Sequence, residues 1–174
     1  MQLIDTHSHL YDEAFESDLQ DALARASDAG VKRLLLPAID SESHEALFTL
    51  CRMAPNMCRP MMGLHPTSVN ENPHWREELA QVEQYLLSPP EGVEFCAVGE
   101  IGLDYYWSQE YVAEQREAFG EQCRLAARLD LPVAIDVLRE RSGMSLGELS
   151  LMLMNMELSG AVRQLPGKLY EKLI

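Results

Sequence analysis

Short apolar segments alternate with amphipathic helical segments over residues 3–135 of this chain. The apolar segments have the length and composition of buried strands, and the segments between them repeat apolar residues at helical spacing. This alternation predicts an α/β protein with a parallel sheet, because consecutive parallel strands need a long crossover connection. The expected strands are 3–7, 31–39, 58–66, 95–104 and 131–135, and the expected helices are 13–29, 41–53, 77–87 and 110–129.

Local signals mark the ends of three of these elements. Gly30 follows the first helix, where a glycine commonly closes a helix. Pro37 is expected to end the second strand, since proline cannot donate a ladder hydrogen bond. Ser41 is expected to cap the N-terminus of the second helix.

Histidines and carboxylates stand where the expected strands end. His7 and His9 close the first strand, His65 closes the third, and Glu100 and Asp104 close the fourth. The carboxyl ends of the strands form the active-site face of a (β/α)₈ barrel, whereas a doubly wound sheet more often carries a Gly-rich phosphate loop after its first strand. The pattern therefore favours a TIM-type barrel. We expect this barrel to be incomplete, because a full barrel has eight strands and this chain supplies about five.

The pair His7 and His9 is the first candidate metal site. Side chains two residues apart on an extended segment face the same side, so both imidazoles can reach one cation. Asp5 is a candidate for an orienting or bridging carboxylate, since metal-bound histidines often donate their other ring proton to such a group. Two ligands are too few for a metal site, and a strand with two exposed histidines is the alternative from these residues alone.

Charge and composition narrow the function classes. The net charge of −14 argues against a broad phosphate-binding surface. No apolar run approaches the roughly 20 residues of a membrane span, and the N-terminus lacks the features of a signal peptide. We therefore expect a cytoplasmic protein with no membrane partner. The cysteines are expected to be reduced thiols without a catalytic role: Cys51, Cys58, Cys96 and Cys123.

Four short segments carry a resemblance to a known family. They are Asp5-Thr6-His7-Ser8-His9, Gly63-Leu64-His65-Pro66, Val98-Gly99-Glu100-Ile101-Gly102-Leu103-Asp104 and Leu131-Pro132-Val133-Ala134-Ile135. In this order they resemble the TatD-like metal-dependent deoxyribonucleases, over about residues 1–135. The resemblance implies a (β/α)₈ barrel that binds two divalent metals and hydrolyses phosphodiester bonds in DNA, often as a 3′ to 5′ exonuclease. It also implies that His7 and His9 ligate one metal and that Glu100, a catalytic residue, bridges both.

Three further residues are candidates for contact with substrate. The resemblance implies that His65 is catalytic and faces the substrate phosphate, with a capping role beside Pro66 as the alternative. Asp104 is a candidate for substrate binding, or else supports the site or starts the following helix. Tyr106 belongs to the loop cluster 105–107 and is a candidate for stacking on an unpaired base, with a lid over the barrel as the alternative.

The family pattern breaks after Ile135. There the family has a histidine that ligates the second metal, whereas this chain has Asp136. A carboxylate can bind a divalent ion, so Asp136 is a candidate ligand. The further histidine and final aspartate that the resemblance implies have no counterpart, because no histidine follows His74. We therefore expect one divalent metal (Mg²⁺, Mn²⁺ or Zn²⁺) rather than two, and weak or absent nuclease activity.

Residues 136–174 follow a different pattern. Two short helices joined by a glycine turn are expected over 136–160, with Ser145 and Glu148 as a capping box. A β-hairpin is expected over 162–171, with Pro-Gly at its tip. This order resembles the C-terminal winged helix of the DNA-processing protein DprA (Smf), without its leading helix. We expect two domains, a truncated barrel over 1–135 and a partial winged helix over 136–174.

The truncated barrel leaves one strand edge open. Strand 131–135 would be an unpaired edge, so we expect either a homodimer or the C-terminal segment to cover it. DNA is the expected substrate of the hydrolase. The alternative function is that of a non-catalytic chimeric or interaction protein, in which the winged-helix remnant contacts other proteins.

Overall fold

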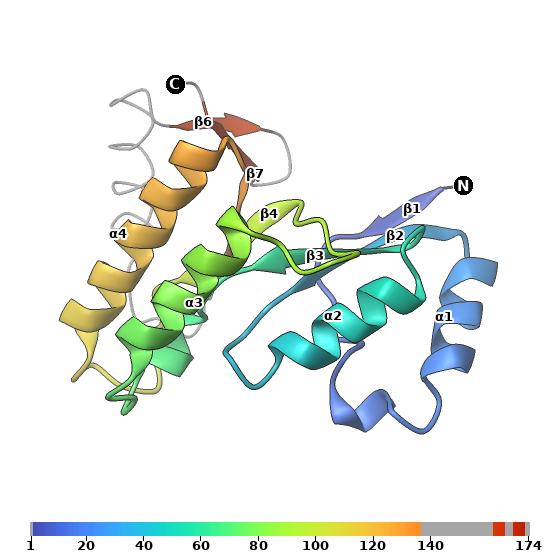
Figure 1. Ribbon diagram of the computed structural model, residues 1–174, viewed down its shortest axis with the longest axis horizontal. Helices are drawn as coiled ribbons and strands as arrows, with labels where there is room; N and C mark the ends of the chain where they lie inside the picture. The colour runs from blue at the N-terminus through green and yellow to red at the C-terminus, as the bar shows by residue number, and fades with distance from the viewer. Residues whose placement is uncertain (1, 137–161, 166–168, 173–174) are drawn as a thin grey trace.

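One curved sheet of seven strands organises the computed structural model, which describes residues 2–136, 162–165 and 169–172 (Figure 1). The first five strands are parallel and lie side by side in chain order, and a C-terminal hairpin continues the sheet antiparallel. In sheet order the strands are β1 (Leu3–Asp5), β2 (Val31–Pro37), β3 (Cys58–Met62), β4 (Ala97–Gly102), β5 (Val133–Asp136), β7 (Leu169–Lys172) and β6 (Val162–Leu165).

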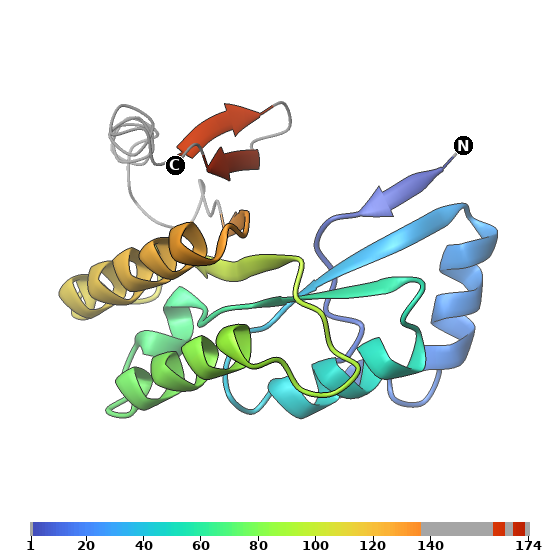
Figure 2. The same ribbon diagram turned by 45° about the horizontal axis from the view of Figure 1, so that its top comes forward.

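The connections between the parallel strands are helical and lie along one side of the sheet (Figures 1 and 2). This arrangement confirms the predicted α/β fold, an incomplete (β/α) barrel with about five parallel strands. The helices are α1 (Leu19–Asp28), α2 (His44–Met53), α3 (Trp75–Leu87) and α4 (Val112–Leu129), with short 3₁₀ turns η1 (Glu13–Phe15) and η2 (Pro66–Val69).

Three helices, α1, α2 and α4, begin later than the sequence predicts, and for α1 and α2 the reason is local. The segment predicted as one helix over 13–29 starts as η1, where the Asp12 carboxylate accepts a hydrogen bond from the Ala14 amide, and only then forms α1. The second helix begins at His44 rather than at Ser41. The Ser43 hydroxyl accepts the amide protons of Ile39 and Asp40, which holds the residues before α2 in a tight loop.

Four strands, β1, β2, β3 and β4, end before the last residue of their predicted range, and two end signals are confirmed. β1 ends before His7, β3 before His65 and β4 before Asp104, so these polar residues lie at or beyond the strand ends. β2 does end at Pro37. Gly30 follows α1 with φ +96°, a conformation that favours glycine, and donates its amide proton to Ser27 O.

A close approach of two strands places β4 beside the end of β3. Gly63 is buried directly after β3, and a Cβ there would lie 2.8 Å from the carbonyl carbon of Gly99 and 2.9 Å from Cγ2 of Ile101. Only a residue without a side chain allows this separation. As a result Glu100, between these two residues, lies near His65.

The C-terminal hairpin covers the last parallel strand. β7 pairs with β5 antiparallel, with Val133 opposite Tyr170, and β6 pairs with β7 (Figure 2). The predicted hairpin is therefore confirmed in its two strands, and it covers the edge for which a homodimer was the other expectation. The helices predicted over 136–160 lie outside the described residues.

The cysteines and helices agree with the sequence on two further points. All four cysteines are free thiols, and burial raises the pKa of the Cys51 thiol to about 12, so this buried group has little thiolate character. Within the described part of the chain, no helix has the length and apolar character needed to cross a bilayer.

His44 is a buried histidine in the core, away from the strand ends. It is 2% exposed, stacks on Phe48 and meets Tyr85 edge-on, and its ring nitrogens have no hydrogen-bond partner among the described residues. Burial lowers the pKa of His44, although the nearby carboxylates of Asp40, Glu78 and Glu45 act in the opposite direction. The folded protein therefore holds this ring neutral at a pH at which the unfolded chain protonates it.

A loss of stability on acidification is the expected result of this burial. In the unfolded chain the His44 ring has a pKa of about 6.5 and binds a proton below that pH, whereas the buried ring of the folded protein does not. The contribution of the neutral, buried ring to the free energy of unfolding is therefore present above about pH 6.5 and is lost as the pH falls. In His44→Leu, the slope of unfolding free energy against pH between about 6.5 and 5 should decrease by up to ~1.4 kcal/mol per pH unit. Urea unfolding at several pH values measures the slope. An unchanged slope in His44→Leu would contradict the prediction.

Candidate metal centre

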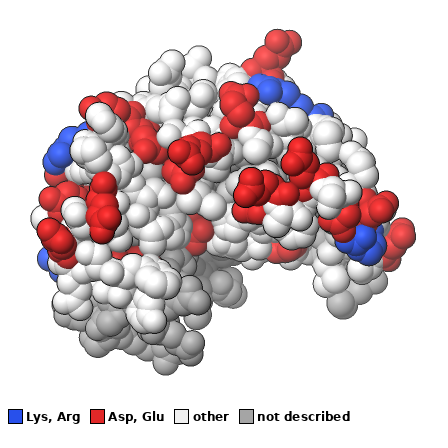
Figure 3. Space-filling model, turned by 90° about the horizontal axis from the view of Figure 1, so that it is seen from below, with Lys and Arg blue, Asp and Glu red and all other residues white. Residues whose placement is uncertain are grey.

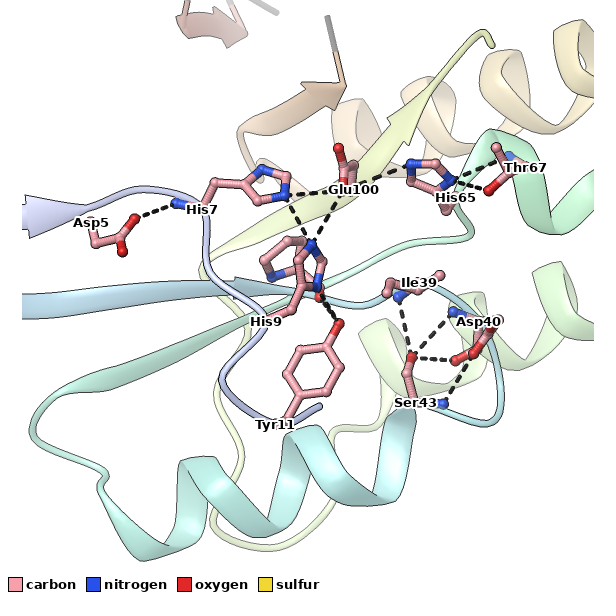
Figure 4. A network of polar contacts seen from close by, with 11 residues as sticks. Asp5, His7, His9, Tyr11, Ile39, Asp40, Ser43, His65, Thr67 and Glu100 are labelled. Carbon is pink, nitrogen blue, oxygen red and sulfur yellow. Dashed lines mark hydrogen bonds and ion pairs between the residues drawn. The ribbon is translucent and has the colours of Figure 1, made fainter. Parts of the chain in front are cut away.

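Three histidine rings surround the carboxylate of Glu100 (Figure 4). Oε2 of Glu100 lies 3.2 Å from Nε2 of His7, 3.8 Å from Nε2 of His9 and 3.9 Å from Nε2 of His65. Glu100 is 5% exposed and comes from β4, whereas the histidines come from the segments that follow β1 and β3. The structure thus brings together four of the residues that the sequence singled out, from β4 and from the segments that follow β1 and β3.

The segment after β1 directs His7 and His9 to the same point. Asp5 Oδ1 accepts a hydrogen bond of 3.1 Å from the main-chain amide of His7, and Ser8 donates to the carbonyl of Leu35 on β2. These contacts turn the chain out of the strand. The described contact of Asp5 is therefore with the backbone of His7, and it does not orient either imidazole as the sequence had led us to expect.

The ligand atoms of His7, His9 and Glu100 form the one group of three potential metal ligands found among the described residues. All lie within 4.8 Å of one another, and the Nε2 atoms of His7 and His9 are only 3.0 Å apart. Two ring nitrogens at this distance share at most one proton. Two imidazoles and a carboxylate suit Zn²⁺ and other divalent first-row metals, so these residues fit such an ion.

Electrostatics favour the ligand form of these groups. Burial raises the pKa of Glu100, but the hydrogen bond from His7 and the nearby histidines outweigh it and lower the pKa overall. Burial lowers the pKa of His9, and the neighbouring His7 acts in the same direction. The carboxylate is therefore ionised and the His9 ring neutral, as metal ligands must be.

His9 has a hydrogen-bond partner on the side away from Glu100. Its Nδ1 lies 2.7 Å from the hydroxyl of Tyr11, which donates to the carbonyl of Pro37 at 2.5 Å (Figure 4). Burial raises the pKa of Tyr11, so the phenol keeps its proton. Tyr11 was not among the residues singled out from the sequence, because its contact depends on Pro37, 26 residues further along the chain.

His65 caps a turn, as one of its two sequence-based alternatives expects, and its other ring nitrogen faces Glu100, whereas contact with a substrate phosphate stays a prediction. Nδ1 of His65 accepts a hydrogen bond from the Thr67 amide at 3.2 Å and lies 2.6 Å from the Thr67 hydroxyl, at the start of η2. The other nitrogen, Nε2, faces Glu100. Thr67 is a second residue that sequence reasoning missed.

Asp104 and Tyr106 lie outside this group. Asp104 is fully buried, and its Oδ1 accepts the amide proton of Tyr106 while Gln115 bonds both main-chain polar groups of Asp104. Tyr106 and Trp107 are 57% and 66% exposed, with ring centroids 4.9 Å apart. Neither Asp104 nor Tyr106 forms a hydrogen bond or ion pair with Glu100 among the described residues.

Asp136 is the last predicted ligand. Its backbone belongs to β5 and lies opposite Gly102 of β4. Its side chain lies outside the described part of the structure, so a contact between its carboxylate and the site stays a prediction.

Two family models match the chain. The model of the TatD related DNases matches residues 4–139, and that of the DprA winged helix domain matches residues 121–168. The two matches overlap over residues 121–139. The second match begins inside α4, upstream of the domain boundary expected near residue 135.

Individual relatives agree with the first match. The chain is 34% identical over 134 residues to the uncharacterized metal-dependent hydrolase YjjV of Escherichia coli (strain K12), covering 77% of this chain and 50% of that protein. It is 33% identical to the 3'-5' ssDNA/RNA exonuclease TatD of Pantoea vagans (strain C9-1), covering 75% and 48%. The chain thus spans about half the length of the curated relatives it matches.

Solved structures share the fold. The crystal structure of YjjV from Escherichia coli superimposes with a TM-score of 0.73 at 30% identity, over 90% of this chain and 57% of that one. An uncharacterized amidohydrolase from Saccharomyces cerevisiae has the same fold, with a TM-score of 0.70 at 18% identity, over 100% and 59%. From the family match over residues 4–139 and these relatives, the chain belongs to the TatD related DNase family.

Proposed function

We propose that this chain carries one half of the active site of a divalent-metal-dependent hydrolase that cleaves phosphodiester bonds in DNA as an exonuclease. The observation that carries the proposal is the convergence of His7, His9 and Glu100 on one point, with ligand atoms from two separate strand ends within 4.8 Å. The exonuclease named among the relatives supports the substrate class. We expect weak activity, because the described residues provide one group of metal ligands where the family resemblance implies two metals.

Each residue of the group has a separate task in this proposal. His7 and His9 would hold one metal through Nε2, and the carboxylate of Glu100 would be a further ligand. A bound divalent metal would lower the pKa of a water molecule and neutralise charge on the scissile phosphate. Zn²⁺, Mn²⁺ and Mg²⁺ are all compatible with the group, in different degrees. Asp136 is proposed as a further ligand.

His65 is proposed to bind the phosphate rather than a metal. Its Nδ1 accepts the amide proton of Thr67, so Nε2, the atom that faces Glu100, carries a ring proton. An N–H group suits an anionic phosphate oxygen as a hydrogen-bond donor. In this proposal the N–H group of His65 would contact the phosphate of the substrate, while His7 and His9 would hold the metal.

The loop after β4 is proposed to contact the bases. Tyr106 and Trp107 are exposed aromatic residues, and stacking on an unpaired base contributes about 1–3 kcal/mol per base. Asp104 acts indirectly, since its carboxylate holds the amide of Tyr106.

The charge of the surface limits how DNA can approach. The chain has 28 acidic and 14 basic residues, and Figure 3 shows a face with many acidic and few basic side chains. Asp12, Glu13, Glu42 and Glu45 line a groove between η1 and α2. Such surfaces repel a phosphate backbone, so contact with DNA is proposed to be short and confined to the metal centre and its neighbouring loops.

Release of nucleotides from single-stranded DNA is the test. With Mn²⁺, Mg²⁺ or Zn²⁺ present, end-labelled single-stranded DNA should be shortened slowly by the full chain, and a chelator should stop the reaction. His7→Ala should abolish the reaction, whereas His74→Ala, at an exposed histidine elsewhere, should leave it unchanged. Shortening that survives His7→Ala, or no shortening with any of the three metals, would refute the proposal.

The second candidate function is a non-catalytic interaction protein. The match of residues 121–168 to the DprA winged helix domain favours it, together with the β6–β7 hairpin. In this case residues 136–174 would form the contact module, and residues 1–135 its support. The two functions differ in their response to a chelator, which should abolish nuclease activity but leave contacts of the winged-helix segment intact.

A further inference from the structure

We propose that Tyr11 fixes the tautomer of His9 and thereby turns Nε2 of His9 into a metal ligand. The inference rests on the proposed metal centre, but it does not depend on nuclease activity. Tyr11 would thus be a positioning residue, acting on the metal only through the ring of His9.

The position of the Tyr11 proton follows from its acceptor. The Tyr11 hydroxyl oxygen lies 2.5 Å from the carbonyl oxygen of Pro37, and a carbonyl oxygen has no proton to offer. The phenolic proton must lie between the two oxygens. Ser43, whose hydroxyl is nearby, donates its own proton to the carbonyl of Asp40 at 2.7 Å.

The position of the His9 proton follows from that of Tyr11. Nδ1 of His9 lies 2.7 Å from the Tyr11 oxygen, whose only proton already points to Pro37. Two lone pairs would repel each other at this distance, so Nδ1 must donate its proton to the oxygen of Tyr11. A neutral imidazole has one ring proton, and Nε2 of His9 therefore presents a lone pair.

This lone pair points into the metal centre. Nε2 of His9 is 3.0 Å from Nε2 of His7 and 3.8 Å from Oε2 of Glu100 (Figure 4). His65, which faces the same carboxylate, has the opposite arrangement, because the Thr67 amide donates to its Nδ1. The hydrogen bond with Tyr11 thus makes Nε2 of His9 a metal ligand, and the hydrogen bond from Thr67 makes Nε2 of His65 a hydrogen-bond donor.

The fold supplies the acceptor from a neighbouring strand. Pro37 is the last residue of β2, and the Ser8 amide makes its backbone bond two residues earlier, at Leu35. The carbonyl of Pro37 lies beyond that bond and receives the side chain of Tyr11 instead. The edge of the Tyr11 ring also meets the His9 ring, with centroids 5.5 Å apart and planes at 81°, which restricts rotation of His9.

The first measurement uses the unaltered, metal-free chain. Long-range proton–nitrogen NMR correlations distinguish the two tautomers of each histidine ring. The proposal expects the proton of His9 on Nδ1 and that of His65 on Nε2. A His9 ring protonated on Nε2 would overturn the proposal, and this result requires neither a variant nor a bound metal.

The second measurement compares variants. Tyr11→Phe keeps the ring but removes the oxygen, so His9 should become a mixture of tautomers and Zn²⁺ affinity should fall by about 10–100-fold in a competition titration. Tyr85→Phe, which removes the hydroxyl of a tyrosine whose ring contacts His44 and Phe48, should keep both properties. Thermal unfolding verifies that each variant is folded.

The outcomes separate this inference from the proposed function. If Tyr11→Phe is folded and binds Zn²⁺ as tightly as the wild type, or keeps His9 fully protonated on Nδ1, the role of Tyr11 is refuted while the metal centre stands. If the wild type binds no divalent metal, the proposed function is refuted, and the ligand role assigned to His9 is refuted with it.

Discussion

Replacing Glu100 by glutamine is expected to lower the affinity of the chain for Zn²⁺ by about 100-fold or more. The carboxylate is the only anionic member of the three-residue group among the described residues, and all three neighbouring histidines face its Oε2. Glutamine keeps the size but removes the charge that offsets the cation. Loss of a supporting group already costs about 10–100-fold in metal affinity, and loss of a ligand costs more.

A competition titration with a coloured chelator measures this effect. Glu77→Gln is the matched control, because Glu77 also lies beside a histidine, with its Oε1 3.7 Å from Nδ1 of His74, but on the exposed surface. The control should bind Zn²⁺ like the wild type. If Glu100→Gln binds within about threefold of the wild type, the metal is held elsewhere and the assignment of the site fails.

Replacing Gly63 by alanine is expected to destabilise the protein and weaken the metal centre together. The added Cβ would lie 2.8 Å from the carbonyl carbon of Gly99 and 3.1 Å from the carbonyl oxygen of Glu100. Backbone atoms cannot move aside as a flexible side chain can. We expect a loss of about 1–3 kcal/mol in the free energy of unfolding, and weaker Zn²⁺ binding because β4 must shift with Glu100.

Urea unfolding of the metal-free chain measures the first effect, and the Zn²⁺ titration measures the second. Gly120→Ala is the control: a Cβ at Gly120 would meet Arg124 at 3.5 Å, in the interior of α4. Alanine there should be neutral or stabilise by up to about 1 kcal/mol, since glycine is a poor helix former. A Gly63→Ala variant as stable as the wild type would show that the two strands can separate without cost.

The order of the strands and helices can be predicted from the sequence because its signals are local. Apolar runs and helical spacing are properties of neighbouring residues, and Gly30 and Pro37 end their elements as expected. The errors at the starts of α1 and α2 arise from side chains that bind the backbone. The hydroxyl of Ser43 and the carboxylate of Asp12 hold turns where the apolar pattern alone predicts helix.

The convergence of His7, His9 and Glu100 can also be predicted, but for a different reason. Strand alternation does not explain it, because β1 ends at Asp5 and both histidines lie beyond the strand. What the sequence does predict is that parallel strands present their carboxyl ends at one edge. The exact meeting of the rings depends on how Asp5 turns the backbone, which spacing alone does not reveal.

The partners of the histidine rings could not be identified from the sequence. Tyr11 needs Pro37 as its acceptor, 26 residues away, and this contact depends on the pairing of β1 with β2. Thr67 acts through its main-chain amide, which every residue except proline has, and through a hydroxyl whose position beside His65 depends on the turn at the start of η2. Such contacts follow from the fold and not from residue type.

The C-terminal hairpin determines how far the sheet can extend. β7 uses hydrogen-bonding groups of β5 at the edge where a (β/α)₈ barrel would add its sixth parallel strand. A sixth strand and β7 would compete for the same backbone groups, so the hairpin-bound form and a closed barrel exclude each other. In the form described, the hairpin ends the series of parallel strands and leaves the two ends of the sheet unjoined.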